Sequence, residues 1–192
     1  MLANLIRLMM KEEVKRFILK FTRSVIENFV KYRKILEIPE NYPEELNEKR
    51  GVFVTLEKNG SLRGCIGIPY PYYKAIESLR SAAIGATQDP RFPPLEEKEL
   101  KDIKIEVSIL TEPKLVKVED PSEYFTKIRK GIDGVIIKHG FNEALYLPQV
   151  WEEIPDELTF FRSLCMKAGL PPNAWKDKEA KIYKFQVESV KE

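Results

Sequence analysis

Apolar residues recur every three or four positions along the first long stretch of the chain. From about Lys11 to Leu36 they alternate with Lys, Arg and Glu in the spacing that places them on one face of a helix. We therefore expect a long helix that packs one face on a core and ends before Pro39 and Pro43. The apolar positions are Val14, Phe17, Ile18, Phe21, Val25 and Phe29.

A β-hairpin is predicted to follow this helix. Residues 51–57 and 61–66 are rich in apolar and β-branched residues, and they flank the pair Asn59-Gly60. Asn-Gly accepts positive φ at both central positions, so it favours a tight two-residue turn. Strict alternation along the second strand would point Leu62, Gly64 and Ile66 to one side, and Arg63, Cys65 and Gly67 to the other.

The rest of the chain alternates between helical and strand patterns. A helix over residues 72–87 should stop at the proline-rich turn that begins with Asp89, because proline cannot continue a helix. Helices are also expected from Asp120-Pro121, from Pro148, and over residues 157–168 after the capping residue Asp156. Strands are predicted at 103–110, 114–118, 134–139, 144–147 and 181–187. This mixture indicates an α+β fold with a mostly antiparallel sheet flanked by helices.

Composition narrows the class of protein. A hydrophobic fraction of 43% in 192 residues supports a packed core, and a net charge of +2 does not favour nucleic acid or an anionic membrane as partner. A charged fraction of 32% with scarce glutamine is typical of proteins from hot-living organisms. Two cysteines make no disulfide framework, so we expect a cytoplasmic protein with reduced thiols. Residues 1–10 are apolar, but Arg7 interrupts them, which predicts neither a signal peptide nor a membrane span.

Five short blocks, in this order, resemble those of the AMMECR family. The chain is similar to that family from the first helix to Val187, and we expect one such domain over residues 11–190, with 1–10 as a short apolar segment. The blocks are Leu62-Arg63-Gly64-Cys65-Ile66-Gly67, Asp89-Pro90-Arg91-Phe92, Ile105-Glu106-Val107-Ser108, Leu147-Pro148-Gln149-Val150 and Lys167-Ala168-Gly169-Leu170-Pro171.

The resemblance implies a fold, a site and partners, but it names no reaction. Members have an α+β fold with a larger and a smaller lobe. They are often encoded with, or fused to, a Memo-type protein and a radical-SAM protein, so these are the partners that the resemblance implies. It implies a cleft around Leu62–Gly67 and leaves the cofactor unknown. The expected ligand-binding residues are Arg63, Gly64, Ile66, Gly67, Asp89, Arg91, Phe92, Glu106 and Gln149.

Cys65 carries the sharpest chemical hypothesis. It lies between Gly64 and Gly67, which leave room for a ligand or a backbone to approach closely. Arg63 on the same face would favour a thiolate, and Cys65 is therefore the candidate nucleophile. The alternative is a buried structural cysteine beside glycines that packing requires.

Other candidates for chemistry have structural readings of equal or greater weight. His139 is the only imidazole and falls at a strand end, where a surface role is favoured over pairing with Cys65. With Cys165 these residues lack the spacing of a zinc site, so no metal is expected. Tyrosines 70, 72 and 73 could stack bases or cover a sheet edge.

The two arginines and Glu106 also admit more than one role. If the strand of Glu106 lay beside that of Arg63, the two side chains could pair across the sheet. Arg91 could bind an anion, or it could tie its own turn to Asp89 or to a neighbouring carbonyl. Two functional classes therefore stay open: a thiol-dependent enzyme acting through Cys65 on a small anionic substrate, and a non-catalytic module that binds a Memo-type partner or nucleic acid.

Overall fold

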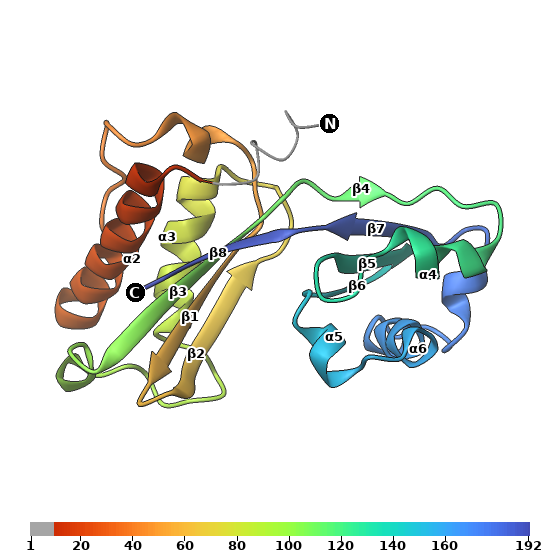
Figure 1. Cartoon of the computed structure of the whole chain (residues 1–192). Coiled ribbons are helices and arrows are strands. Elements are labelled where there is room, and N and C mark those ends of the chain that lie inside the picture. Colours follow the sequence, from red (N-terminus) through yellow and green to blue (C-terminus); the bar gives the residue numbers. More distant parts are fainter. Residues whose placement is uncertain (1–9) are drawn as a thin grey trace. The chain divides into compact units, whose positions relative to one another are not determined.

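The chain forms two compact units. The computed structural model describes residues 10–192, so most of the apolar segment predicted at 1–10 lies outside the described residues. The larger unit runs to Leu110 and includes Glu188–Glu192, whereas the smaller unit is Thr111–Val187. The smaller unit is therefore an insertion between two parts of the larger one, as the colours of Figure 1 show. That residues 11–190 behave as one domain stays a prediction.

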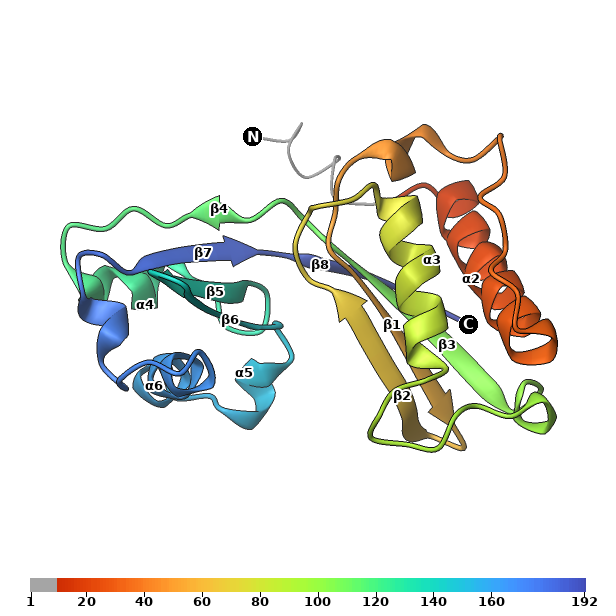
Figure 2. The ribbon, with the colours of Figure 1, turned by 180° about the vertical axis from the view of Figure 1, so that it is seen from behind.

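The larger unit is a four-stranded sheet with two helices on one face (Figures 1 and 2). Its helices are α2 (Glu12–Tyr32) and α3 (Ala75–Ala86), and its strands in spatial order are β2 (Ser61–Ile68), β1 (Val52–Lys58), β3 (Ile103–Leu110) and β8 (Val187–Lys191). Alternate residues of β1, namely Val52, Val54 and Leu56, are fully buried against the helices. The predicted first helix and hairpin are confirmed, and Asn59 and Gly60 both have the positive φ that the turn requires.

A β-bulge breaks the predicted alternation of the second hairpin strand. Leu56 of β1 pairs with Gly64, but the next residue, Glu57, pairs with Leu62. Arg63 is therefore the extra residue of the bulge. The prediction that Leu62 shares a face with Gly64 and Ile66 is wrong for this reason, while the relation between Gly64 and Ile66 holds.

The smaller unit has its own sheet and core. Its strands in spatial order are β4 (Lys114–Leu115), β7 (Lys181–Phe185), β5 (Gly134–His139) and β6 (Asn142–Tyr146), and its helices are α4 (Tyr124–Lys127), α5 (Val150–Glu153) and α6 (Glu157–Lys167). Trp151 stacks on Phe160 at 3.5 Å between ring centroids, and Phe161 packs against Trp175. Short 3-10 turns at 44–47, 97–99, 121–123 and 174–176 complete the described chain. The α+β class with antiparallel sheets, predicted from the pattern, is confirmed.

The strand predicted at residues 181–187 is two strands in two different sheets. β7 belongs to the smaller unit and β8 to the larger, and the chain passes between them at Gln186. The backbone N–H of Gln186 donates to Thr111 Oγ1, and the N–H of Thr111 donates to the Gln186 carbonyl. These two hydrogen bonds join the first residue of the insertion to a residue at its other end.

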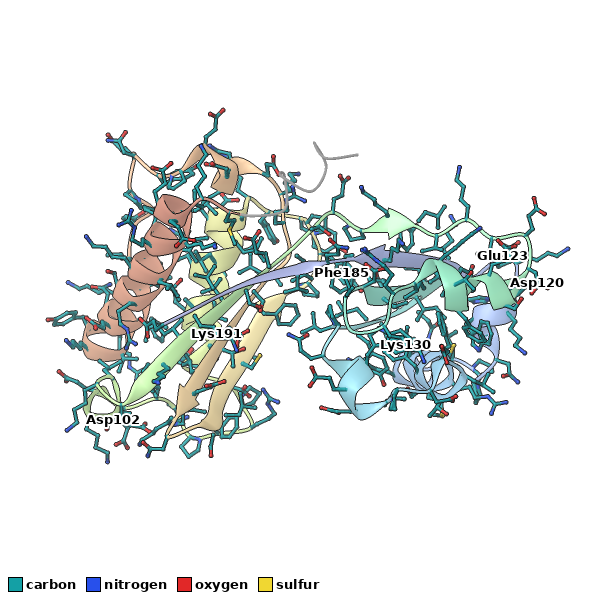
Figure 3. All side chains as sticks on the ribbon, in the orientation of Figure 1. Asp102, Asp120, Glu123, Lys130, Phe185 and Lys191 are labelled. Carbon is teal, nitrogen blue, oxygen red and sulfur yellow. The ribbon has the colours of Figure 1, made fainter. Side chains whose placement is uncertain are left out.

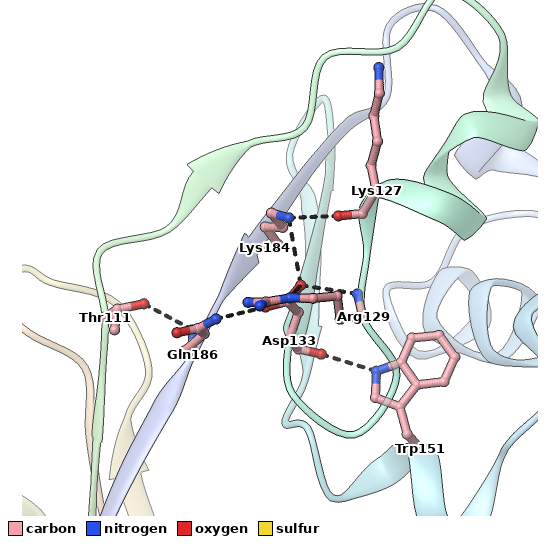
Figure 4. A network of polar contacts seen from close by, with 7 residues as sticks. All are labelled: Thr111, Lys127, Arg129, Asp133, Trp151, Lys184 and Gln186. Atoms are coloured by element: carbon pink, nitrogen blue, oxygen red, sulfur yellow. Dashed lines mark hydrogen bonds and ion pairs between the residues drawn. The ribbon is translucent and has the colours of Figure 1, made fainter. Parts of the chain in front are cut away.

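A buried carboxylate organises this end of the smaller unit (Figure 4). Asp133 is 1% exposed and accepts hydrogen bonds from the backbone and guanidinium of Arg129 and from Gln186 Nε2. Lys184 Nζ lies 3.6 Å away, and Trp151 Nε1 donates to the Asp133 carbonyl. Burial alone would raise the pKa of Asp133, but the hydrogen bonds from Arg129 and Gln186 and the charge of Lys184 together outweigh it, and the pKa is lowered. The cluster therefore has a structural role, because it joins the segment before β5 to strand β7 and helix α5.

Helix length and polarity decide whether a helix could span a membrane. Within residues 10–192, the helices are too short or too polar to cross a bilayer.

Candidate functional site

Side chains of four strands form a row on the sheet face opposite α2 and α3, which we call the open face. Thr55 of β1 pairs with Cys65 of β2 on one side and with Glu106 of β3 on the other. Thr55 Oγ1 donates to Cys65 Sγ at 3.2 Å, and Lys191 Nζ lies 2.7 Å from a Glu106 carboxylate oxygen. Lys191, labelled in Figure 3, comes from the C-terminal strand β8. A thiol, a hydroxyl and an ion pair thus lie side by side.

A second row on the open face contains an aromatic ring and two hydroxyls. Phe53 pairs with Gly67 on β2 and with Ser108 on β3. A Cβ placed on Gly67 would lie 2.3 Å from the Phe53 ring, so the absence of a side chain at 67 is what lets this ring pack across the strand. Ser108 Oγ and Ser189 Oγ are 2.9 Å apart. Gly67 therefore serves the packing of Phe53.

Gly64 and Ile66 face the helices instead. A Cβ on Gly64 would lie 2.2 Å from the carbonyl oxygen of Ala86, at the end of α3. Ile66 packs against Gly85, where an added Cβ would lie 2.7 Å from the Ile66 side chain. The close approach expected at Gly64 is thus an approach of helix backbone to strand.

Arg63 is bound by a single carboxylate on the loop before β3. Its Nε and Nη2 donate to the two oxygens of Glu99 at 3.0 and 2.9 Å, and Lys58 Nζ donates to the same carboxylate at 2.8 Å. Arg63 Nη2 also donates to the Pro94 carbonyl at 3.4 Å. The hydrogen bond from Arg63 lowers the pKa of Glu99 to about 2, although burial opposes it. Arg63 therefore ties the bulge to the segment before β3, and its guanidinium is already hydrogen-bonded to Glu99 and to the Pro94 carbonyl.

Asp89 and Arg91 hold the backbone of Cys65. An oxygen of the buried Asp89 carboxylate accepts the N–H of Cys65 at 2.8 Å, and Arg91 Nη2 donates to the Cys65 carbonyl at 3.2 Å. Arg91 Nη2 also donates to Asp89 at 2.6 Å, and this bond lowers the pKa of Asp89 well below its ordinary value. Of the two roles open to Arg91, the structure has the tie to Asp89 and a carbonyl. The Arg91 guanidinium also lies 5.7 Å from the Phe92 ring centroid.

Several predicted combinations are not formed. Glu106 does not meet Arg63, because β1 lies between their strands, and it pairs with Lys191 instead. His139 belongs to the smaller unit, where its Nε2 lies 3.2 Å from Asp177. Gln149 is exposed before α5 in the same unit.

The remaining sequence candidates do not add chemistry to the open face. Cys165 is fully buried in the core of the smaller unit, and burial raises the pKa of its thiol. Over residues 10–192, His, Cys, Asp and Glu side chains form no group that could hold a metal ion. Two depressions on the described surface lie away from the open face, one near Phe17 and Pro43 and another near Leu100.

Sequence reasoning missed half of the open face. Alternation along residues 51–57 places Phe53 and Thr55 on one face of the first hairpin strand, and the hairpin brings them beside the second strand. The sequence therefore carried a signal for these two residues. Ser189 and Lys191 gave no such signal, because the pattern does not mark β8 as a strand of its own. Their neighbours Glu188 and Glu192 are polar, and only Val190 is buried.

Comparisons with known proteins agree with the resemblance carried by the five blocks. The AMMECR1 family model matches residues 19–190. A protein of Methanocaldococcus jannaschii is 49% identical over 180 residues, covering 92% of this chain and 89% of its own. A protein of Methanothermobacter thermautotrophicus is 47% identical over 175 residues, covering 90% and 91%. These relatives come from thermophilic archaea, as the composition predicts for this chain.

A solved structure extends the similarity to the fold. The crystal structure of an uncharacterized protein of Pyrococcus horikoshii superposes with a TM-score of 0.83 at 43% sequence identity. The match covers 94% of this chain and 92% of that one.

Proposed function

The chain belongs to the AMMECR1 family, and on that premise we propose that the open face of its larger unit is a binding surface centred on Cys65. In this account the surface recognises a protein partner, and Cys65 is a contact and not a nucleophile. Gly67 and Glu106 belong to the same face, and Gln149 belongs to the other unit.

One observation carries this proposal: the polar residues predicted around Cys65 are already used to build the strand. Arg63 is bound by Glu99, and Arg91 by Asp89 and the Cys65 carbonyl. Among the described residues, the side chain that hydrogen-bonds Cys65 Sγ is the Thr55 hydroxyl, which is no general base. A base beside the sulfur favours thiol catalysis and an uncommitted cation favours anion binding. The contacts of Cys65, Arg63 and Arg91 described above supply neither, so binding is the function that this geometry favours.

The charge pattern of the open face favours a protein over a nucleic acid. Glu57 lies directly opposite Lys104, and Glu106 is paired with Lys191, so acidic and basic groups alternate. A phosphate backbone requires an excess of positive charge, which this face lacks. The family resemblance supplies the candidate partners, a Memo-type protein and a radical-SAM protein, and we propose the Memo-type protein as the first to test.

A thiol-dependent enzyme is the second candidate, and one contact favours it. The hydroxyl of Thr55 donates to Cys65 Sγ, which is the direction of hydrogen bond that a thiolate would use. A reaction on a small anionic substrate would then need a base and a cation other than the groups whose contacts are described above.

Calorimetric titration against a Memo-type protein separates the two candidates. The Cys165→Ala background removes the second thiol, and three forms are compared: unmodified, Cys65→Ser, and unmodified protein alkylated at Cys65 with N-ethylmaleimide. Serine keeps a small polar group on the face, so the affinity should change by less than about twofold. The bulky adduct should weaken binding by about tenfold or more.

Each outcome has a distinct meaning. Binding that survives alkylation would contradict the placement of the surface on the open face. Absence of binding by the unmodified chain would remove the Memo-type partner from the account. Loss of a measured turnover in Cys65→Ser, with binding retained, would establish the enzyme candidate instead.

A further inference from the structure

We propose that Asp89 and Arg91 are positioning residues for Cys65, and that their side chains take the place of a neighbouring strand on the outer edge of β2. The inference rests on the proposed function, because it concerns the residue at the centre of the open face. Residues Asp89 to Phe92 would then support the binding surface without themselves contacting the partner.

The position of β2 in the sheet makes such a substitute necessary. Within residues 10–192, β2 is the edge strand of its sheet and pairs with β1 alone. The N–H and C=O of Cys65 point away from β1, as shown by their bonds to Asp89 and Arg91. In an antiparallel pair, a neighbouring strand would accept from that N–H and donate to that C=O. The carboxylate accepts the N–H at 2.8 Å and the guanidinium donates to the C=O at 3.2 Å, so the pair supplies both bonds.

The pair is built to hold this position firmly. Asp89 is buried, and one of its oxygens also accepts the N–H of Arg91 at 3.0 Å, which closes the turn on itself. The turn follows α3 directly, and the close contact of Gly64 with the Ala86 carbonyl fixes the end of that helix against β2. The pair of Asp89 and Arg91, which we call the clamp, is therefore anchored at the end of α3, the helix that covers the other face of β2.

The pair of Asp89 and Arg91 sets the direction of the Cys65 side chain. Fixing both peptide groups of Cys65 holds the strand flat at this residue, so that its thiol stays on the open face beside Thr55. An edge strand without a partner frays and twists more readily than an internal one. Loosening the clamp should therefore expose the Cys65 amide and change the accessibility of its thiol together.

The smaller unit provides a matched control. Asp133 and Arg129 form a pair of the same kind, in which the carboxylate is 1% exposed and the arginine side chain is 54% exposed, against 1% and 56% for Asp89 and Arg91. Arg129 closes its own loop and contributes nothing to β2. Removing Arg129 thus costs a similar ion pair without touching Cys65.

The test measures two properties of Cys65 in the full chain carrying Cys165→Ala. Hydrogen exchange of the Cys65 amide is followed by NMR, and the rate of Cys65 alkylation by iodoacetamide is followed by mass spectrometry. Arg91→Ala should speed amide exchange by about tenfold and shift the alkylation rate by more than about threefold, whereas Arg129→Ala should leave both within about twofold. Circular dichroism establishes that each variant is folded.

A conservative variant keeps the test decisive. Arg91→Lys retains the charge beside Asp89 but loses the planar fork that also reaches the Cys65 carbonyl, so it should give an intermediate change in a folded protein. Unchanged exchange and alkylation in both Arg91 variants would overturn the proposal, as would equal changes in Arg129→Ala. Neither measurement involves a partner, so a failure here is distinct from a failure of the proposed binding surface.

Discussion

Five residues of the block, Arg63 to Gly67, each have specific contacts in the structure. The need for room at Gly64 and Gly67 could be predicted from the residue type, because glycine permits close approach. What approaches could not be predicted, since the Ala86 carbonyl comes from a helix over twenty residues away in sequence and the Phe53 ring from the neighbouring strand. Cys65 differs from these two glycines, because its side chain accepts a hydrogen bond from Thr55 on the open face.

The two glycines should differ in their tolerance of alanine. In Gly64→Ala the new methyl group meets helix backbone at 2.2 Å, which cannot move without shifting α3, so we expect a loss of about 3 kcal/mol in the free energy of unfolding. In Gly67→Ala it meets the Phe53 ring, which can rotate away, and about 1 kcal/mol should be lost. Urea unfolding measures both. Adding Phe53→Leu should rescue Gly67→Ala only, and rescue of both or neither would argue against these contacts.

At the scale of elements, the hairpin, the first helix and β3 follow from local pattern, and the ties between elements do not. Asn59-Gly60 fixes a turn through its own backbone preference. Arg63 at the bulge is held by Glu99, which lies far along the chain and also binds Lys58. β8 was missed for a related reason: its place beside β3 is set by the passage of the chain at Gln186.

The Glu99 tie should make the stability of the larger unit depend on pH. The pKa of Glu99 is lowered in the folded protein to about 2, from an ordinary value of 4.5. A lowered folded-state pKa stabilises the fold above the unfolded value, and the contribution is lost as pH falls from about 4.5 toward 2. Wild type should therefore lose more stability than Glu99→Gln over this interval, on the order of 2 kcal/mol, in urea melts at each pH. Parallel pH profiles for the two proteins would rule out this role.

At the scale of the whole molecule, the chain is a sheet unit interrupted by an inserted unit. The α+β class and the larger and smaller lobes followed from the sequence and its family resemblance. The return of the last residues to the larger sheet could not be predicted, because a strand whose partner lies far away in the sequence leaves no local pattern. Glu192 shows what the return contributes: its carboxylate pairs with Arg23 and accepts the N–H of Ile105.

The insertion predicts how the two units behave when separated. Residues 111–187 contain their own core, and we expect this segment to fold alone with a cooperative thermal transition. Residues 10–110 lack β8 and should be less stable than the same segment joined to residues 187–192 by a short Gly-Ser linker. The linker can be short, because Thr111 and Gln186 are hydrogen-bonded at that point. Equal melting temperatures for the two versions would show that β8 is dispensable.

A protein partner seated on the open face would shield Cys65, and protection of this thiol from alkylation tests that placement most directly. The full chain with Cys165→Ala is treated with iodoacetamide, alone and with a saturating Memo-type protein, and mass spectrometry follows Cys65. A partner seated on this face should slow the reaction by about tenfold or more. A complex that forms while Cys65 reacts at its free rate would place the partner elsewhere and contradict the account.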